Sequence, residues 1–98
     1  MKTPQTQIDI DKVWQDFFET RSEACRNLLM MHYAPIVKYT AERIWVKLPD
    51  KVDLDDLIQA GIFGLMDAID GFDSTRGIKF ETYCTPRIRG SILDELRS

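Results

Sequence analysis

The sequence lacks a disulfide framework, a membrane-spanning run and any strand-like alternation. Its two cysteines, Cys25 and Cys84, are too few to form a set of bridges, and neither has a C-x-x-C partner for metal or redox chemistry. We therefore expect two buried thiols in a reducing cytoplasm. No apolar run is long enough to cross a membrane and no signal-peptide pattern is present, so we expect a cytoplasmic protein without membrane association.

Helical spacing of apolar residues runs through most of the 98 residues. It predicts an all-α fold, a compact bundle of about four helices. Residues 1–20 are expected to form an N-terminal extension with a short helix, and residues 21–98 the main domain. Pro35 predicts a kink or a break near Ala34, and Thr85–Pro86 allows a second break. The expected helices cover about residues 9–20, 22–47, 53–70 and 79–96, with loops at "LPDKVD" and "FDSTRG".

The net charge of −3 hides a segregation along the chain. Residues 50–73 contain seven aspartates and one lysine, a net charge of −6, whereas residues 74–98 contain five cations and three carboxylates, a net charge of +2. An acidic segment followed by a basic one is typical of a protein with two partners of opposite charge. The plainer alternative is a pair of solvated helix faces, and charge alone favours that alternative.

The helix expected over residues 53–70 has an apolar side and an acidic side. Asp53 is its expected N-cap and Gly71 its end. The apolar stripe consists of Leu54, Leu57, Ile58, Gly61, Leu65, Ala68 and Ile69. The acidic side consists of Asp55, Asp56, Gln59, Asp67 and Asp70, together with Phe63 and Met66. An apolar anchor surrounded by charge predicts a protein-docking surface, unless another helix of the domain covers Phe63.

The segment "FETYCTPRIRG", residues 80–90, combines aromatic rings with arginines in an acidic protein. A helical wheel places Phe80, Tyr83 and Arg87 together, away from a core stripe of Ile88, Ile92 and Leu96. Aromatic rings can stack on unpaired bases while arginines hold phosphates, so this face predicts a surface for single-stranded nucleic acid. The alternative is that Phe80 and Tyr83 fill the seam with the second helix.

The run "DLIQAGIFGLMDAIDGFD" followed by "RGIKFETY" resembles region 2 of the sigma-70 family of bacterial RNA polymerase sigma factors. The ending "TYCTPRIRGSILDELRS" is similar to the flagellar and sporulation (FliA/WhiG-like) group, and "NLLMMHYAPIVKYTAERIWVKLP" to the first part of region 2. The resemblance covers about residues 25–98 and is far more specific than any short motif.

This resemblance implies two sets of contacts. The helix over 53–70 would dock on a coiled coil of the largest subunit of core RNA polymerase, through Asp55, Asp56, Gln59, Phe63 and Met66. The following segment would open the minus-ten promoter element and hold its non-template strand. Phe72, Asp73, Arg76 and Tyr83 match positions that line a pocket for a flipped adenine, Lys79, Phe80 and Thr82 match positions that hold the melted strand, and Arg87 and Arg89 would hold its phosphates.

Three departures from the primary sigma factors bear on function. Pro86 and Arg87 stand where those proteins carry two tryptophans that wedge the edge of the bubble, so melting must rely on something else or be weaker. Gly90 replaces a side chain that reads the base pair upstream, so promoter preference should differ. Ala60 replaces a docking glutamate, which trims the acidic surface without removing it.

We therefore expect a sigma-factor domain that is not an enzyme and needs no cofactor or metal. An anti-sigma factor remains open as a further partner. One alternative is a truncated module that binds polymerase or an anti-sigma factor without opening DNA, and another is a metal-dependent enzyme built on "DLDD" with His32. Nothing up to Ser98 resembles the later sigma domains, so a fragment and a naturally short protein both remain open.

Overall fold

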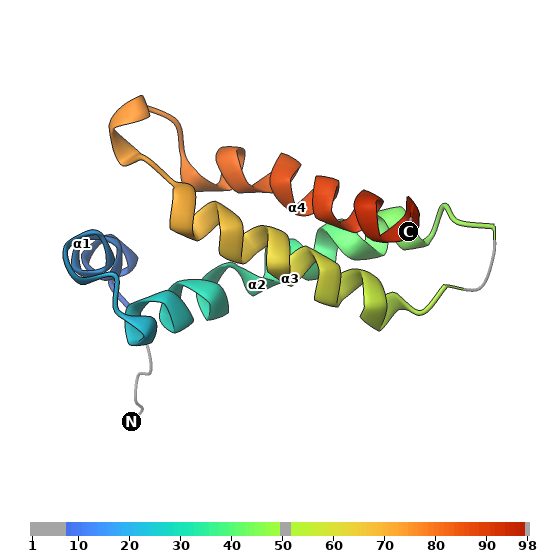
Figure 1. Ribbon diagram of the computed structural model, residues 1–98, viewed down its shortest axis with the longest axis horizontal. Coiled ribbons are helices and arrows are strands. Elements are labelled where there is room, and N and C mark those ends of the chain that lie inside the picture. The colour runs from blue at the N-terminus through green and yellow to red at the C-terminus, as the bar shows by residue number, and fades with distance from the viewer. Residues whose placement is uncertain (1–7, 50–51, 98) are drawn as a thin grey trace, which may run out of the picture. The chain divides into compact units, whose positions relative to one another are not determined.

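The computed structural model describes residues 8–49 and 52–97. The elements follow in the order α1 (Ile10–Thr20), α2 (Glu23–Trp45), α3 (Leu54–Gly71), the short 3-10 helix η1 (Ser74–Arg76) and α4 (Phe80–Arg97) (Figure 1). The described residues contain no strand, so the all-α prediction is confirmed. None of their helices is long and apolar enough to cross a membrane.

The chain forms two compact units that meet in sequence within α2, between His32 and Tyr33. The sequence analysis expected a domain boundary after residue 20 instead. That domain boundary stays a prediction.

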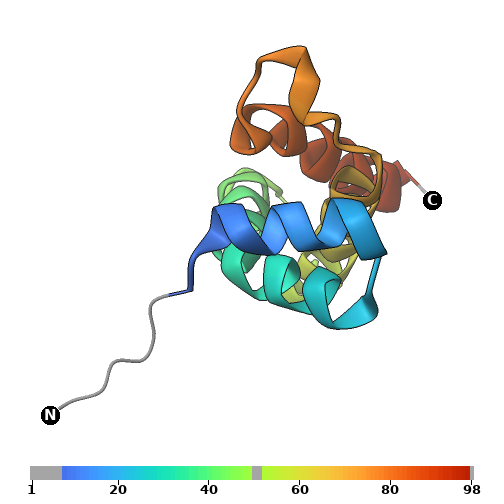
Figure 2. The ribbon, with the colours of Figure 1, turned by 90° about the vertical axis from the view of Figure 1, so that its left-hand side faces the viewer.

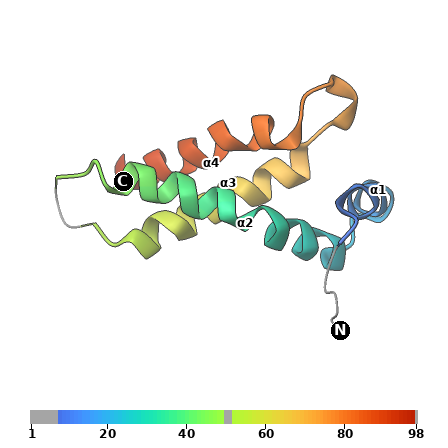
Figure 3. The ribbon, with the colours of Figure 1, turned by 180° about the vertical axis from the view of Figure 1, so that it is seen from behind.

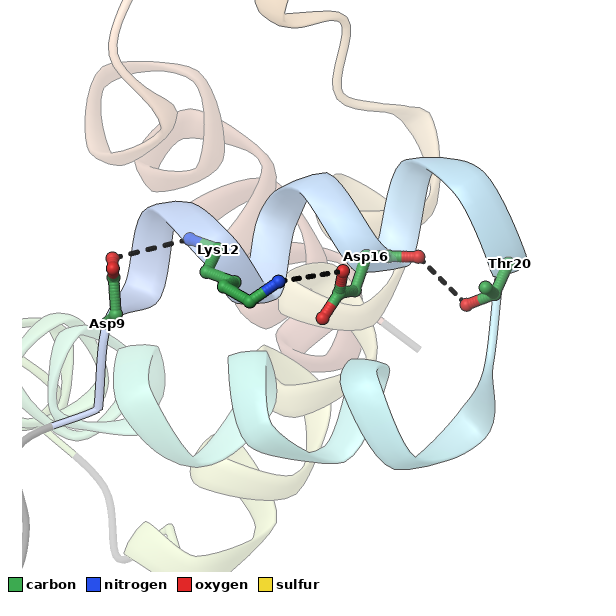
Figure 4. A network of polar contacts seen from close by, with 4 residues as sticks. All are labelled: Asp9, Lys12, Asp16 and Thr20. Atoms are coloured by element: carbon green, nitrogen blue, oxygen red, sulfur yellow. Dashed lines mark hydrogen bonds and ion pairs between the residues drawn. The ribbon is translucent and has the colours of Figure 1, made fainter.

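The first unit contains α1 and the beginning of α2 (Figure 2). Asp9 caps α1, as its Oδ1 accepts a hydrogen bond from the Lys12 backbone N–H at 3.3 Å. Lys12 also pairs with Asp16 at 3.7 Å, and the Thr20 hydroxyl donates to the Asp16 carbonyl at 2.8 Å (Figure 4). The predicted short helix is therefore present, and local capping defines where it begins.

A turn at Arg21 separates α1 from α2. Arg21 has a left-handed φ of 54°, and its N–H donates to the Phe17 carbonyl at 2.7 Å. Its guanidinium lies 4.8 Å from the centroid of the Phe17 ring, a cation–π contact that helps to hold this unusual backbone conformation. The Ser22 hydroxyl oxygen then accepts from the Cys25 N–H at 3.0 Å and caps α2.

The second unit is built on an antiparallel hairpin of α3 and α4 that lie side by side (Figures 1 and 3). Its fully buried side chains come from both helices and include Leu57, Leu65, Ile69, Ile88 and Ile92. The predicted stripes are therefore mostly core, although Leu54, Ile58 and Leu96 are only half-buried.

Two glycines let the helices of the second unit approach closely. A Cβ on Gly61 would lie 2.8 Å from the Val37 Cγ1 of α2. A Cβ on Gly64 would lie 2.8 Å from the Arg87 carbonyl oxygen of α4. The second contact is with backbone, which cannot move aside as a side chain can, so α3 and α4 can pack this closely only without a side chain at position 64.

Neither proline interrupts its helix. Helix α2 continues through Pro35 and α4 continues through Pro86. Both prolines are exposed, so water can satisfy the carbonyl group that each leaves without its N–H partner. The kink near Ala34 stays a prediction.

The two thiols differ in burial. Cys84 is fully buried, as expected, and burial raises its pKa from 9.0 to about 11. Cys25 is only half-buried, which corrects the expectation of two buried thiols.

Candidate nucleic-acid and protein interfaces

The turn between α3 and α4 is shaped by Asp73. Its Oδ1 accepts from the Thr75 N–H at 2.9 Å and from the Thr75 hydroxyl at 2.6 Å, which starts η1. The Thr75 hydroxyl and N–H, and to a smaller extent the positive charge of Arg76, lower the pKa of Asp73. Gly77 ends η1 with a φ of +79°, a left-handed conformation that favours glycine, and the chain then enters α4.

This turn and the first half of α4 enclose a pocket of about 220 Å³. Its lining residues are Gly71, Phe72, Asp73, Arg76, Ile78, Tyr83 and Arg87. Five of the nine residues expected to contact DNA therefore lie around one pocket. They combine aromatic rings, a carboxylate and two guanidinium groups, which is a suitable lining for a planar, polar and negatively charged ligand.

Tyr83 is held in place from three sides. Its hydroxyl donates to the Gly71 carbonyl at 3.2 Å, and the Phe72 ring lies 5.4 Å from its ring centroid. The Arg87 guanidinium lies 4.5 Å from the same centroid, within cation–π range. Tyr83 remains half-buried, so part of its ring is accessible from the pocket.

Phe80 does not share an exposed face with Tyr83 and Arg87, which corrects the helical-wheel expectation. Only 4% of its surface is accessible, because its ring packs 4.5 Å from the Tyr33 ring of α2 and 5.2 Å from Phe72. This is the alternative in which Phe80 fills the seam with the second helix. Its contact with a melted strand stays a prediction, and its visible role is to support Phe72 at the pocket wall.

The remaining predicted DNA contacts lie outside the pocket. Lys79, Thr82 and Arg89 are all exposed. Lys79 immediately precedes α4, and Thr82 is in its first turn. Arg89 is two residues beyond Arg87, which places it about 200° away around the helix.

The acidic face of α3 is open to solvent. Asp53 caps the helix by accepting from the Asp55 N–H at 3.0 Å. The Phe63 side chain is 63% exposed, so no helix of the described chain covers it. Asp55, Asp56 and Gln59 are exposed on the same side of α3, within about two turns before Phe63, and Met66 is half-buried. The residues predicted to dock on polymerase therefore share one accessible helix face.

Among the residues that the structure describes, no three His, Cys, Asp and Glu side chains come together to hold a metal ion. Asp53 of the "DLDD" motif serves as a helix cap instead. The structure thus offers no support for the metal-enzyme hypothesis.

Comparison with known proteins assigns the family. Residues 29–98 match the family described as sigma-70 region 2. The chain belongs to this family. The match confirms the resemblance seen in the sequence, and sigma factors are non-enzymatic transcription factors, as expected.

The relatives of this sigma-70 region 2 domain include RNA polymerase sigma factors named FliA and sigma-D. It is 49% identical over 73 residues to the RNA polymerase sigma factor FliA of Salmonella typhimurium, which covers 74% of the chain and 30% of the relative. It is 44% identical over 85 residues to the RNA polymerase sigma-D factor of Bacillus subtilis, which covers 87% of the chain and 34% of the relative. The chain thus spans about a third of the length of these relatives.

Two residues of the pocket were missed by the sequence analysis. Gly71 contributes its carbonyl, which accepts the Tyr83 hydroxyl, and Ile78 is an apolar wall that is 45% exposed. The only signal for Ile78 in the sequence was its position directly after Gly77, in the expected turn. A backbone carbonyl gives no signal in a sequence.

Proposed function

We propose that this sigma-70 region 2 domain binds core RNA polymerase and holds one unpaired base of the minus-ten non-template strand. The observation that carries the proposal is the pocket beside η1, where Phe72, Asp73, Arg76, Tyr83 and Arg87 converge. The cytoplasm, where polymerase works, is the proposed compartment.

The pocket lining suits a flipped base in three ways. The accessible part of the Tyr83 ring offers a stacking surface, and stacking is worth roughly 1–3 kcal/mol per base. Asp73 can accept hydrogen bonds and Arg76 can donate them, which matches the mixed donors and acceptors on a base edge. Extruding a base costs a few kcal/mol, so stacking and hydrogen bonds together can offset that cost.

Arg87 takes a position that suits the edge of the melted segment. Its guanidinium is oriented by the Tyr83 ring at 4.5 Å. A guanidinium plane can stack on a base and also neutralise a phosphate. In this proposal Arg87 replaces part of the wedge that primary sigma factors build from tryptophan.

Docking on polymerase would use the acidic face of α3, with Phe63 as its anchor. An exposed aromatic ring on the same helix face as Asp55, Asp56 and Gln59 fits a partner surface that has both apolar and basic groups. A coiled coil of the largest subunit is the proposed partner. An anti-sigma factor that competes for the same face is also compatible with this geometry.

The proposal is tested by binding of a fluorescent single-stranded minus-ten oligonucleotide to core polymerase reconstituted with the chain. Tyr83→Ala should weaken binding by roughly 1–3 kcal/mol, because one stacked base is lost. Tyr83→Phe is the matched control: it keeps the ring, loses the bond to the Gly71 carbonyl and should bind almost as wild type does. Thermal melts would show that both variants fold.

If a folded Tyr83→Ala variant binds the oligonucleotide normally, the pocket does not hold a base. If wild-type chain binds polymerase but the complex ignores the oligonucleotide, the chain is an interaction module that does not open promoters.

A further inference from the structure

Four aromatic rings form a continuous row from the core of the second unit to the pocket beside η1. The ring centroid of Tyr33 in α2 lies 4.5 Å from that of Phe80 in α4, and Phe80 lies 5.2 Å from Phe72. Phe72 in turn lies 5.4 Å from Tyr83. All four residues, called the aromatic row below, belong to the second compact unit. Only Phe72 and Tyr83 line the pocket.

The aromatic row changes from buried to accessible along its length. Tyr33 and Phe80 are buried, whereas Phe72 and Tyr83 are half-buried. A base in the pocket can therefore touch the last two rings, while Tyr33 and Phe80 lie behind them. Phe80 contacts both accessible rings, since its centroid also lies 6.4 Å from that of Tyr83. Tyr33 can thus influence the pocket through Phe80 without touching a ligand.

Phe72 needs this support because it lies outside the helices. It directly follows α3, with an extended backbone (φ −70°, ψ 135°), and leads into η1. A half-buried ring in such a connection can change rotamer unless neighbouring side chains restrict it. The Phe72 and Phe80 rings meet edge to face, with an interplanar angle of 82°. The ring quadrupoles favour this arrangement, so the contact sets the orientation of the Phe72 ring as well as burying it.

Burial alone does not require an aromatic ring at position 33. Much of the core of this unit is aliphatic, and its fully buried side chains include Leu57, Leu65 and Ile92, which do not line the pocket. The hydrophobic effect is non-directional, so an aliphatic side chain at position 33 could also keep water out. A ring adds a directional contact with Phe80, and that contact is what the pocket can use.

We propose that Tyr33 is a positioning residue for the pocket beside η1. Through Phe80 it holds the Phe72 and Tyr83 rings in the orientation that accepts an unpaired base. The inference rests on the proposed function, because the pocket must take a base for this orientation to matter. A site whose walls are fixed before binding loses less conformational freedom when the ligand arrives. The Tyr83 hydroxyl, which donates to the Gly71 carbonyl at 3.2 Å, fixes the other end of the row.

The test measures how much one base contributes to DNA binding. Core polymerase reconstituted with the chain is titrated with the intact minus-ten oligonucleotide and with versions that carry an abasic site in place of one adenine. The adenine whose loss weakens wild-type binding most defines the ratio of abasic to intact dissociation constants. Tyr33→Leu should lower this ratio about twofold to tenfold, the range that corresponds to one aromatic pair. Tyr33→Phe keeps the ring and should keep the ratio.

Ile92→Val is the matched control, because Ile92 is fully buried in the same unit and lies outside the aromatic row. It should lower the midpoint of thermal unfolding and leave the ratio unchanged. A purely structural role of Tyr33 predicts the same result for Tyr33→Leu, a lower midpoint with the wild-type ratio. That result, or equal weakening of the intact and abasic strands, would overturn the inference.

A double variant tests the route through Phe80. If Tyr33 acts through Phe80, Tyr33→Leu should lower the ratio no further in a chain that already carries Phe80→Leu. Additive losses would mean that Tyr33 reaches the pocket by another route and would contradict the inference. If Tyr33→Leu does not fold, Tyr33→Met is used in the same measurements, because methionine fills irregular gaps without an aromatic ring.

The inference and the proposed function fail at different points. If the wild-type chain binds the intact strand and every abasic strand equally, the pocket holds no base, and the proposed function falls together with the inference. If the wild type prefers the intact strand and a folded Tyr33→Leu keeps that preference, only the positioning role of Tyr33 is wrong.

Discussion

Gly64 and Gly90 show how the surroundings of a single residue reverse the effect of one substitution. A Cβ at Gly64 would lie 2.7 Å from the Ser91 Oγ and 2.8 Å from the Arg87 carbonyl oxygen. Nothing lies within 4 Å of the corresponding position at Gly90, which is also helical. The first glycine is required by packing, whereas the second only weakens its helix.

We predict that Gly64→Ala destabilises the protein and that Gly90→Ala stabilises it. Overpacking should cost Gly64→Ala about 1–3 kcal/mol, because backbone of α4 must move away. Gly90→Ala should gain up to about 1 kcal/mol from helix propensity. Urea unfolding followed by circular dichroism measures both, and a Gly64→Ala variant as stable as wild type would show that α3 and α4 can separate without loss.

Phe80 shows why the role of a residue is harder to predict than its helix. Its own helix was predicted correctly, and the wheel placed it near Tyr83. The ring that covers it is Tyr33, which lies 47 residues earlier in the chain. No local pattern indicates that pairing. Only the fold shows that Phe80 packs in the core, whereas the sequence left contact with the melted DNA strand equally open.

At the scale of the element, helix ends were predictable and helix interruptions were not. Asp53 was predicted as a cap, and the structure confirms it, because capping depends on residues within a few positions. Pro35 and Pro86 were expected to allow breaks because proline disfavours a helix locally. Both helices continue because their buried side chains pack against other helices, and that contribution is not local.

Two pockets of the second unit also differ in whether a local sequence pattern could locate their residues. The residues that line the pocket beside η1 all come from one stretch, Gly71 to Arg87, so a sequence motif could locate most of them. A second pocket lies between the end of α2 and the second half of α4. It joins Arg43 and Lys47 to Arg89, more than forty residues away, and only the fold brings them together. The sequence offered one signal for this second pocket. Arg89 is two residues beyond Arg87, so helical geometry places the two side chains on different sides of α4.

The acidic face of α3 gives a prediction at the scale of one element. Phe63→Ala should weaken binding of core polymerase by more than about 1 kcal/mol if the ring is an anchor buried by the partner. Val46→Ala is the control, because Val46 is similarly exposed, at 68% against 63%, but lies away from this face. Fluorescence anisotropy of labelled chain titrated with core polymerase measures both, and equal affinities would place the docking surface elsewhere.

At the scale of the whole molecule, the same chain carries acidic and basic surfaces. Residues 50–73 have a net charge of −6 and residues 74–98 a net charge of +2. The exposed Asp67 lies four residues before Gly71 at the pocket, about 6 Å along the helix axis. Carboxylates this close repel DNA phosphates, so the isolated chain should bind a single strand weakly.

We therefore predict that polymerase raises the affinity of the domain for DNA by covering these carboxylates. Asp67→Asn should increase binding of the minus-ten oligonucleotide to the isolated chain severalfold at about 0.01 M salt, where the Debye length is about 30 Å. The gain should nearly vanish at 1 M salt, where that length is about 3 Å. It should also vanish in the complex with core polymerase, because the partner then shields position 67. Titrations of both proteins at the two salt concentrations measure this, and an equal gain with and without polymerase would mean that docking leaves Asp67 exposed.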